Sequence, residues 1–174
     1  CRCARAAVAG GRCIASIHNR FALLLDFRFD GFAAGSTKQV IAPMASAELA
    51  VVAVAGGQQL HARVVGAPPL IFPLPIVVGR WYRVDWSATK TDGQGHVLSV
   101  RAWNLQTGVF KPLVASTDCL WQAFNADIPD SASAAFGNYP GEAPATTFFK
   151  GRMDNVSVLN YRYSGKPAGC VLQP

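Results

Sequence analysis

The sequence has few charged residues and no long apolar run. Of its 174 residues, 10 are Asp or Glu and 16 are Lys or Arg, and charged residues make up only 15% of the chain. This low charge content, together with 51% apolar residues, excludes a disordered chain or a coiled coil. No apolar stretch approaches the ~20 residues that a membrane helix needs, so no membrane span is expected. The length favours a single domain, 1–174, with a full hydrophobic core.

Paired carboxylates suited to glycoside hydrolysis are also missing. The only glutamates are Glu48 and Glu142, and neither has a carboxylate two or four residues away. Hydrolysis needs two carboxyl groups flanking the bond. Asp26 and Asp30 share a strand face, but the strand rise would separate them by ~13 Å, beyond the ~5–10 Å that glycosidases use. We interpret them, with Arg28 between them, as a solvent-facing charge row.

Motifs for nucleophilic catalysis are equally absent. There is no G-x-S-x-G elbow, and none of the three histidines, His18, His61 and His96, has a Cys or Asp at a suggestive spacing. Tyr82, His61 and Arg63 supply the residue types of a polysaccharide lyase, but no lyase motif accompanies them. We expect no catalytic residue and no enzyme activity.

The positive charge is scattered. The net charge is +6, mostly from single arginines, without the basic cluster or motif that marks a nucleic-acid site. We therefore expect no nucleic-acid partner and interpret the charge as a well-solvated basic surface. The alternative is a preference for acidic partners, such as glycans that bear uronate or sulfate.

Five cysteines indicate an oxidising compartment, and so a secreted or cell-surface protein. Their spacing lacks the paired C-x-x-C pattern of a zinc site. The preferred pairing is Cys3 with Cys13 and Cys119 with Cys170, although sequence alone does not fix connectivity and other pairings remain open. Cys1 would then be unpaired, linked outside the domain, lipidated, or the end of a piece cut from a longer chain.

Apolar and polar residues alternate over many short segments, which is typical of a β-sandwich. The alternation is clearest over 21–30, and Gly56-Gly57 predicts a hairpin between 48–54 and 59–65. Four prolines make 67–75 an edge or a covering loop. A short helix is expected within 118–130. Further strands are expected at 13–17, 39–43, 109–116, 132–138 and 147–161, between a disulfide-stapled N-terminal segment (1–13) and a C-terminal tail (162–174).

The stretch 79–108 predicts two paired strands joined by the turn-rich loop 89–95. Each arm has an apolar face and a mixed polar face, because successive side chains of a strand point to opposite sides. The apolar faces consist of Tyr82, Val84 and Trp86 in the first arm and Leu98, Val100 and Ala102 in the second.

Three segments in order resemble the concanavalin A-like lectin/glucanase superfamily, and in particular its laminin G-like and pentraxin-like modules. They are GRWYRV at 79–84, AFGN at 135–138 and FKGRMDNVSV at 149–158. The resemblance covers most of 14–163. It implies an all-β fold, a jelly-roll sandwich of two antiparallel sheets.

The mixed faces of the two central strands carry the candidate ligand-binding residues. If the strands pair, Arg83, Asp85, Arg101 and Trp103 would share one outer surface, and an aromatic ring beside Arg and Asp suits a sugar. The alternative is a cross-strand salt bridge with Trp103 packed under a loop. Tyr139, in a loop, is a further candidate.

The resemblance also implies roles for other residues. It puts Trp81 at a packing position in the core, and it makes Asp154 part of a structural calcium site. The alternative for Asp154 is a turn cap that accepts backbone N–H bonds. By the same resemblance Asn155, in the sequon Asn-Val-Ser, is exposed and open to glycosylation. Trp86 is expected in the core, and Trp121 under a disulfide.

These features favour a non-catalytic extracellular module for carbohydrate or matrix recognition, part of a larger protein or assembly. Its partner would be a glycan of the extracellular matrix or a cell-wall polysaccharide, and its only cofactor a structural calcium ion. The alternative function is a structural module in an extracellular or virion-surface filament, whose outer face contacts other protein domains. A polysaccharide lyase or hydrolase with an unfamiliar site is the third reading.

Overall fold

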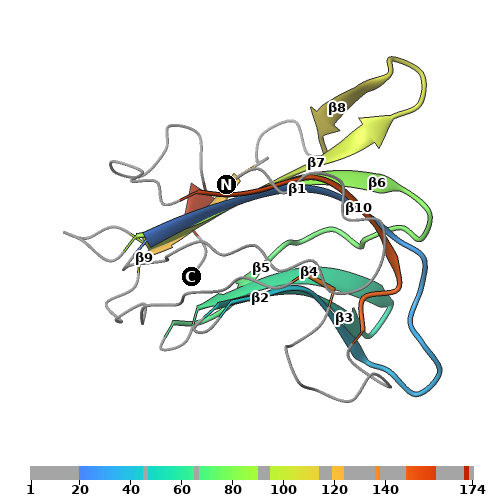
Figure 1. Cartoon of the computed structure of the whole chain (residues 1–174), viewed down its shortest axis with the longest axis horizontal. Coiled ribbons are helices and arrows are strands. Elements are labelled where there is room, and N and C mark those ends of the chain that lie inside the picture. The colour runs from blue at the N-terminus through green and yellow to red at the C-terminus, as the bar shows by residue number, and fades with distance from the viewer. Residues whose placement is uncertain are drawn as a thin grey trace.

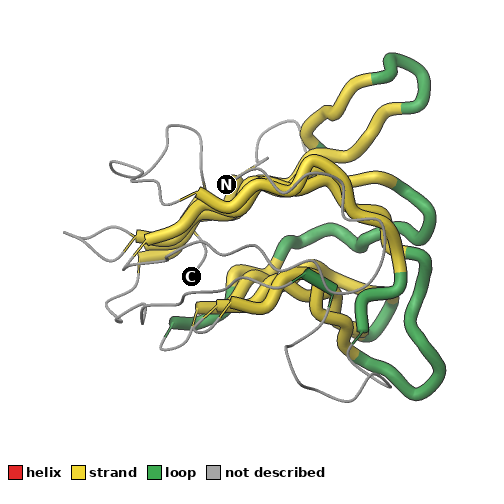
Figure 2. Tube along the Cα trace, viewed as in Figure 1, coloured by secondary structure: helices red, strands yellow, loops and turns green. Residues whose placement is uncertain are grey.

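Two β-sheets pack face to face (Figures 1 and 2). The computed structural model describes residues 20–44, 47–64, 67–89, 95–113, 119–123, 136–137, 148–159 and 171–172. These residues form strands, turns and loops and no helix, and so no helix that could cross a membrane. The all-β sandwich predicted from the sequence is confirmed. The other segments, with the strand expected at 13–17, lie outside the described residues.

The larger sheet has seven strands in the order β10-β1-β6-β7-β9-β11, with β8 paired to β7. All its pairings are antiparallel except that of β11 with β9. The closing strand expected near the C-terminus therefore lies beside the first described strand. The strands are β1 (Arg20–Phe29), β6 (Trp81–Thr89), β7 (Gly95–Asn104), β8 (Val109–Pro112), β9 (Cys119–Ala123), β10 (Gly151–Leu159) and β11 (Val171–Leu172).

The smaller sheet has four strands in the order β2-β3-β4-β5. The predicted hairpin is confirmed, with Gly56 and Gly57 at φ 91° and 151°, a region that glycine enters without steric cost. The proline-rich segment contributes only the two-residue β5 at the edge of the sheet, as expected. The strands are β2 (Lys38–Met44), β3 (Ala47–Val54), β4 (Gly57–Val64) and β5 (Leu70–Ile71).

The core fills the space between the sheets with the apolar faces that the alternation predicts. The Phe21 ring meets Trp86 edge to face at 4.8 Å, and Phe27 stacks on Tyr82 at 5.5 Å. All four rings are fully buried, and burying each large side chain contributes about 1.5–3 kcal/mol. The Tyr82 hydroxyl accepts the Val77 N–H at 2.8 Å, so it is not left unsatisfied in the core.

The helix expected within 118–130 is wrong in its described part. Residues 119–123 form β9, which pairs with β7 so that Leu120 lies opposite Leu98 and is buried. Pairing to an existing sheet edge buries this leucine, which outweighs a weak local preference for helix. The remainder of that segment lies outside the described residues.

Cys119 is disulfide-bonded. The other four cysteines, Cys1, Cys3, Cys13 and Cys170, all lie outside the described residues, and so does its partner. The predicted partner is Cys170, which precedes β11 in sequence. The parallel register of β11 with β9, in which Val171 pairs with Leu120, is compatible with this bond.

We predict that peptide mapping of the unreduced protein by mass spectrometry will find Cys119 joined to Cys170. Reduction of the protein should then cost about 2–5 kcal/mol of stability. Because one bond is lost either way, the Cys119→Ser/Cys170→Ser double variant should be no less stable than either single variant in urea denaturation. A peptide joining Cys119 to any other cysteine would refute the pairing.

His61, on β4, faces outward from the smaller sheet beside the Lys38–Glu48 ion pair, whose charged atoms are 2.6 Å apart. Its Nε2 is buried without a hydrogen-bond partner among the described residues. Burial lowers the pKa of His61, Lys38 lowers it further, and Glu48 partly raises it. Folding therefore favours the neutral imidazole.

We predict that stability falls as the pH drops below about 6.5, the ordinary pKa of histidine. The unfolded chain takes up a proton there that the folded chain resists, so the loss builds up from pH 6.5 down to the lowered pKa. His61→Gln should remove this part of the pH dependence, as measured by urea denaturation at pH 7.5 and 5.5. An unchanged slope in the variant would contradict the assignment.

Candidate functional site

The outer face of the larger sheet carries the polar residues of its central strands. Pairing of β6 with β7 sets Arg83 opposite Arg101, and Trp103, two residues after Arg101, points to the same side of the sheet. Asp85, two residues after Arg83, lies opposite Ser99. The four candidate ligand-binding residues of these strands therefore share one surface, as the alternation predicts. Tyr139 lies outside the described residues.

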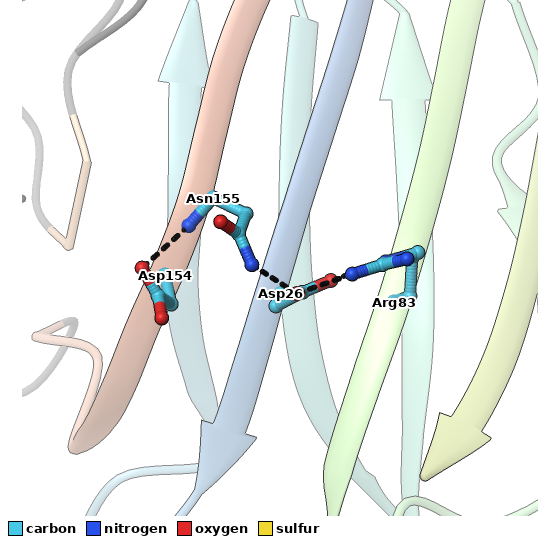
Figure 3. Close-up of polar contacts among 4 residues, drawn as sticks. All are labelled: Asp26, Arg83, Asp154 and Asn155. Atoms are coloured by element: carbon cyan, nitrogen blue, oxygen red, sulfur yellow. Dashed lines mark hydrogen bonds and ion pairs between the residues drawn. The ribbon is translucent and has the colours of Figure 1, made fainter. Parts of the chain in front are cut away.

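Asp26, on β1, is the buried centre of this face. Arg83 donates two hydrogen bonds to its carboxylate, from Nε to Oδ1 at 2.7 Å and from Nη2 to Oδ2 at 2.8 Å (Figure 3). The Asp26 side chain is only 6% exposed, so its prediction as a solvent-facing charge is wrong. The other two residues of the predicted charge row, Arg28 and Asp30, do lie near the surface, where they pair with each other through hydrogen bonds of 2.8 and 3.0 Å.

A bulge in β10 brings Asn155 to the same carboxylate. In the pairing of β1 with β10, Leu24 lies opposite Ser157 and Asp26 opposite Asp154, so β10 has one extra residue. Asn155 has a φ of 52°, in the left-handed region that Asn enters more readily than most residues. Its Nδ2 donates to Oδ2 of Asp26 at 2.7 Å (Figure 3).

Asp154, the candidate calcium ligand, is exposed, and its Oδ1 accepts the backbone N–H of Asn155 at 2.8 Å (Figure 3). This is the backbone role considered as the alternative. Within the described part of the chain, no group of three or more His, Cys, Asp or Glu side chains could hold a metal ion. Calcium binding stays a prediction, as does glycosylation of Asn155.

Arg83, Asp26 and Asn155 form a polar row, and two aromatic rings beside it, Trp103 and Phe110, form an aromatic wall. The β7–β8 hairpin projects from the sandwich (Figure 1), and its Trp103 and Phe110 rings meet edge to face at 5.0 Å. The Arg83 guanidinium lies 4.3 Å from the centre of the Phe110 ring, a cation–π contact. The alternative for this face agrees in one part, because Arg83 forms a cross-strand salt bridge with Asp26 on β1.

Trp81 belongs to this outer face, and its assignment to the core is wrong. Tyr82 occupies the inward position, so Trp81 points outward with Arg83 and is partly exposed. Trp86, at an inward position, is fully buried as predicted. The side chain of Trp121 lies outside the described residues.

The side chains of the outer face line an open pocket of about 340 Å³. Of the predicted ligand-binding residues, Arg83 and Trp103 line it. Asp85 and Arg101 lie outside its lining; burial raises the pKa of the Asp85 carboxyl, and the charge of Arg101 partly lowers it. The lining comes from five strands and consists of Asp26, Trp81, Arg83, Trp103, Phe110, Asp154 and Asn155.

Sequence reasoning did not assign Asp26, Trp81, Phe110 or Asn155 to ligand binding. A signal existed for Trp81, because strict alternation gives it the same side as Arg83. None existed for Asn155, whose approach to Asp26 depends on a bulge between strands 129 residues apart.

Comparison with solved structures identifies the fold. A heptameric pentraxin from Limulus polyphemus aligns over 88% of this chain and 70% of its own, with a TM-score of 0.54 and 12% identity. The LG1–3 region of the laminin α2 chain aligns over 87% of this chain and 30% of its own, with a TM-score of 0.55 and 14% identity. A scytalido-glutamic peptidase aligns with a TM-score of only 0.43, which is too low to carry an argument about activity.

No protein-family model matches the sequence, and a search of curated proteins finds no match. The structural alignments agree with the resemblance read from the sequence motifs. The chain has a concanavalin A-like, laminin G-like sandwich fold.

The positive φ of Asn155 at the bulge can be tested by substitution. We predict that Asn155→Ala is less stable than Asn155→Gly by about 1 kcal/mol in urea denaturation, because Ala resists a positive φ. Both variants lose the bond to Asp26, worth about 0.5–1.5 kcal/mol. Equal stability of the two variants would show that the backbone strain is not there.

Proposed function

We propose that this sandwich of the concanavalin A-like, laminin G-like fold is a non-catalytic glycan-recognition module that binds its ligand in the outer-face pocket. The observation that carries the proposal is an aromatic wall, Trp103 with Phe110, beside a prearranged polar row, Arg83 with Asp26 and Asn155. A sugar ring has an apolar C–H face and hydroxyl edges, and this pocket offers a surface for each.

The polar row supports binding because it is already held in place. Arg83 is fixed by two hydrogen bonds to Asp26 and by its contact with Phe110. A side chain that is ordered before the ligand arrives loses little further conformational entropy on binding. The pocket is also open, which suits one or two units of a long polymer.

The same row argues against Asp26 as the acid of a glycosidase. Asp26 and Asp154 lie opposite each other on neighbouring strands, and they are the one pair of carboxylates among the described residues that line the pocket. A glycosidase needs one of its two carboxyl groups to donate a proton. Both oxygens of Asp26 already accept hydrogen bonds from Arg83, and one also from Asn155, which leaves Asp26 poorly placed as a proton donor.

The setting we propose is secreted or cell-surface, within a larger protein or assembly, with an extracellular-matrix or cell-wall polysaccharide as partner. The disulfide at Cys119 supports this, because such bonds persist in oxidising compartments. A structural calcium ion at Asp154 remains part of the proposal. It predicts that a chelator lowers the melting temperature of the metal-loaded protein.

One observation favours the alternative, an assembly module whose outer face contacts protein. Leu105, at the tip of the projecting β7–β8 hairpin, has 91% of its surface exposed to solvent, and Val109 in the same hairpin has 48% exposed. Apolar side chains held away from the body of a protein are suited to contact with a partner. In that case the hairpin, and not the pocket, would be the functional element.

We predict that wild-type protein is retarded in native affinity gels that contain its polysaccharide, without release of sugar. Trp103→Ala and Trp81→Ala should each weaken this binding about tenfold or more, equivalent to ~1.4 kcal/mol, because the ring loses its stacking surface. Both residues are partly exposed, so the unfolding midpoint in urea should change little.

Leu105→Ala is the matched control, an apolar truncation on the same hairpin that does not line the pocket. It should leave retardation intact. If no gel retards the protein while Leu105→Ala changes its oligomeric state in sedimentation, the assembly function replaces glycan binding. Sugar release that is lost in a pocket variant would instead establish an enzyme.

A further inference from the structure

We infer that the outer-face pocket selects uncharged glycans and disfavours acidic ones, although the chain as a whole carries a net charge of +6. This inference rests on the proposed function and specifies its ligand class. It depends on where the charges lie and on which hydrogen-bonding atoms remain open to a ligand.

The described lining of the pocket has one cation and two anions. Arg83 directs Nε and Nη2 at Asp26, so its charge is balanced by a carboxylate that is only 6% exposed. In the calcium-free protein, Asp154 adds an exposed carboxylate at the rim. The lining therefore carries a net charge of about −1, and an anionic ligand entering it would meet repulsion well within the Debye length of ~8 Å.

The arginines of the surrounding face are matched by aspartates. Arg28 forms a two-bond ion pair with Asp30, and the charges of Arg152 and Lys150 act on the same carboxyl. The charge of Arg101 acts on Asp85. Around the pocket the described arginines equal the aspartates in number: Arg28, Arg83, Arg101 and Arg152 against Asp26, Asp30, Asp85 and Asp154.

Much of the described positive charge lies elsewhere. Lys38 and Arg63 are on β2 and β4 of the other sheet, and Arg80 is in a loop. Lys111, on β8, pairs with the inward-facing Ala102 and so lies on the opposite face of the hairpin from Phe110. The excess that gives the chain its basic character is therefore spread over surfaces other than this pocket. A basic overall charge does not make this site a receptor for acid groups.

The open hydrogen-bonding atoms suit hydroxyl groups. Arg83 keeps its Nη1 hydrogens, while Asn155 Oδ1 and Asp154 Oδ2 have no partner among the described residues. Vicinal hydroxyls of a sugar can accept from the guanidinium and donate to the two oxygens at once. A carboxylate or sulfate can only accept, so it would leave both oxygens without a donor and add charge repulsion.

The test compares neutral and acidic polysaccharides in native affinity electrophoresis at low and physiological salt, with a chelator present so that Asp154 holds no calcium. The neutral set is dextran, mannan and galactan, and the acidic set is polygalacturonate, chondroitin sulfate and heparin. We expect wild-type protein to bind a member of the neutral set at least tenfold more tightly than any acidic polymer at both salt concentrations.

Asp154→Asn tests the charge argument, because the amide oxygen can still accept the Asn155 N–H while the negative charge is gone. The ratio of acidic to neutral binding should rise at least tenfold at low salt, and less at physiological salt. Glu48→Gln, on the other sheet, changes the net charge equally and should leave the ratio within twofold of wild type.

The outcomes separate the two proposals. Tighter binding of an acidic polymer that is lost in Arg83→Met would overturn the inference and leave glycan recognition standing. An unchanged ratio in Asp154→Asn, or an equal rise in Glu48→Gln, would also overturn it. Retardation by no polysaccharide, in protein whose urea midpoint shows it to be folded, would refute glycan recognition and the inference with it.

Discussion

The ion pair between Asp26 and Arg83 is the interaction on which the outer face depends. A carboxylate as buried as Asp26 is costly unless its oxygens are hydrogen-bonded and its charge is balanced. Arg83 meets both needs from the next strand, and Asn155 adds a third donor from the strand on the other side. Because the guanidinium is held flat against Asp26, the Phe110 ring can cover it, which joins the polar row to the aromatic wall.

This arrangement follows from the core. Large apolar side chains at alternate positions of β1 fix which residues of that strand point outward, and Asp26 is among them. The antiparallel register with β6 then sets Arg83 beside it. A shift of one residue would turn the phenylalanines of β1, or Tyr82 and Trp86 of β6, outward, so the hydrophobic core and the position of the ion pair are determined together.

Alternation alone was enough to predict the sandwich, most of its strands and the common face of Arg83 and Trp103, because parity along a strand is a local property. The same rule contradicted the core assignment of Trp81, which came from family resemblance. Burial of Asp26, the bulge at Asn155 and the reach of Phe110 depend on contacts between distant strands. No local pattern encodes such register, and the strand at 119–123 was missed for the same reason.

The bulge at Asn155 has a consequence for how the protein is produced. The nitrogen that donates to Asp26 is the atom to which an Asn-Val-Ser sequon attaches an oligosaccharide. A chain made in a eukaryotic secretory pathway and modified there would carry its own sugar at the wall of the pocket, in the space open to a ligand. A chain made in bacteria without that modification would present the pocket empty. The expression host thus determines which of two chemically different surfaces an assay meets.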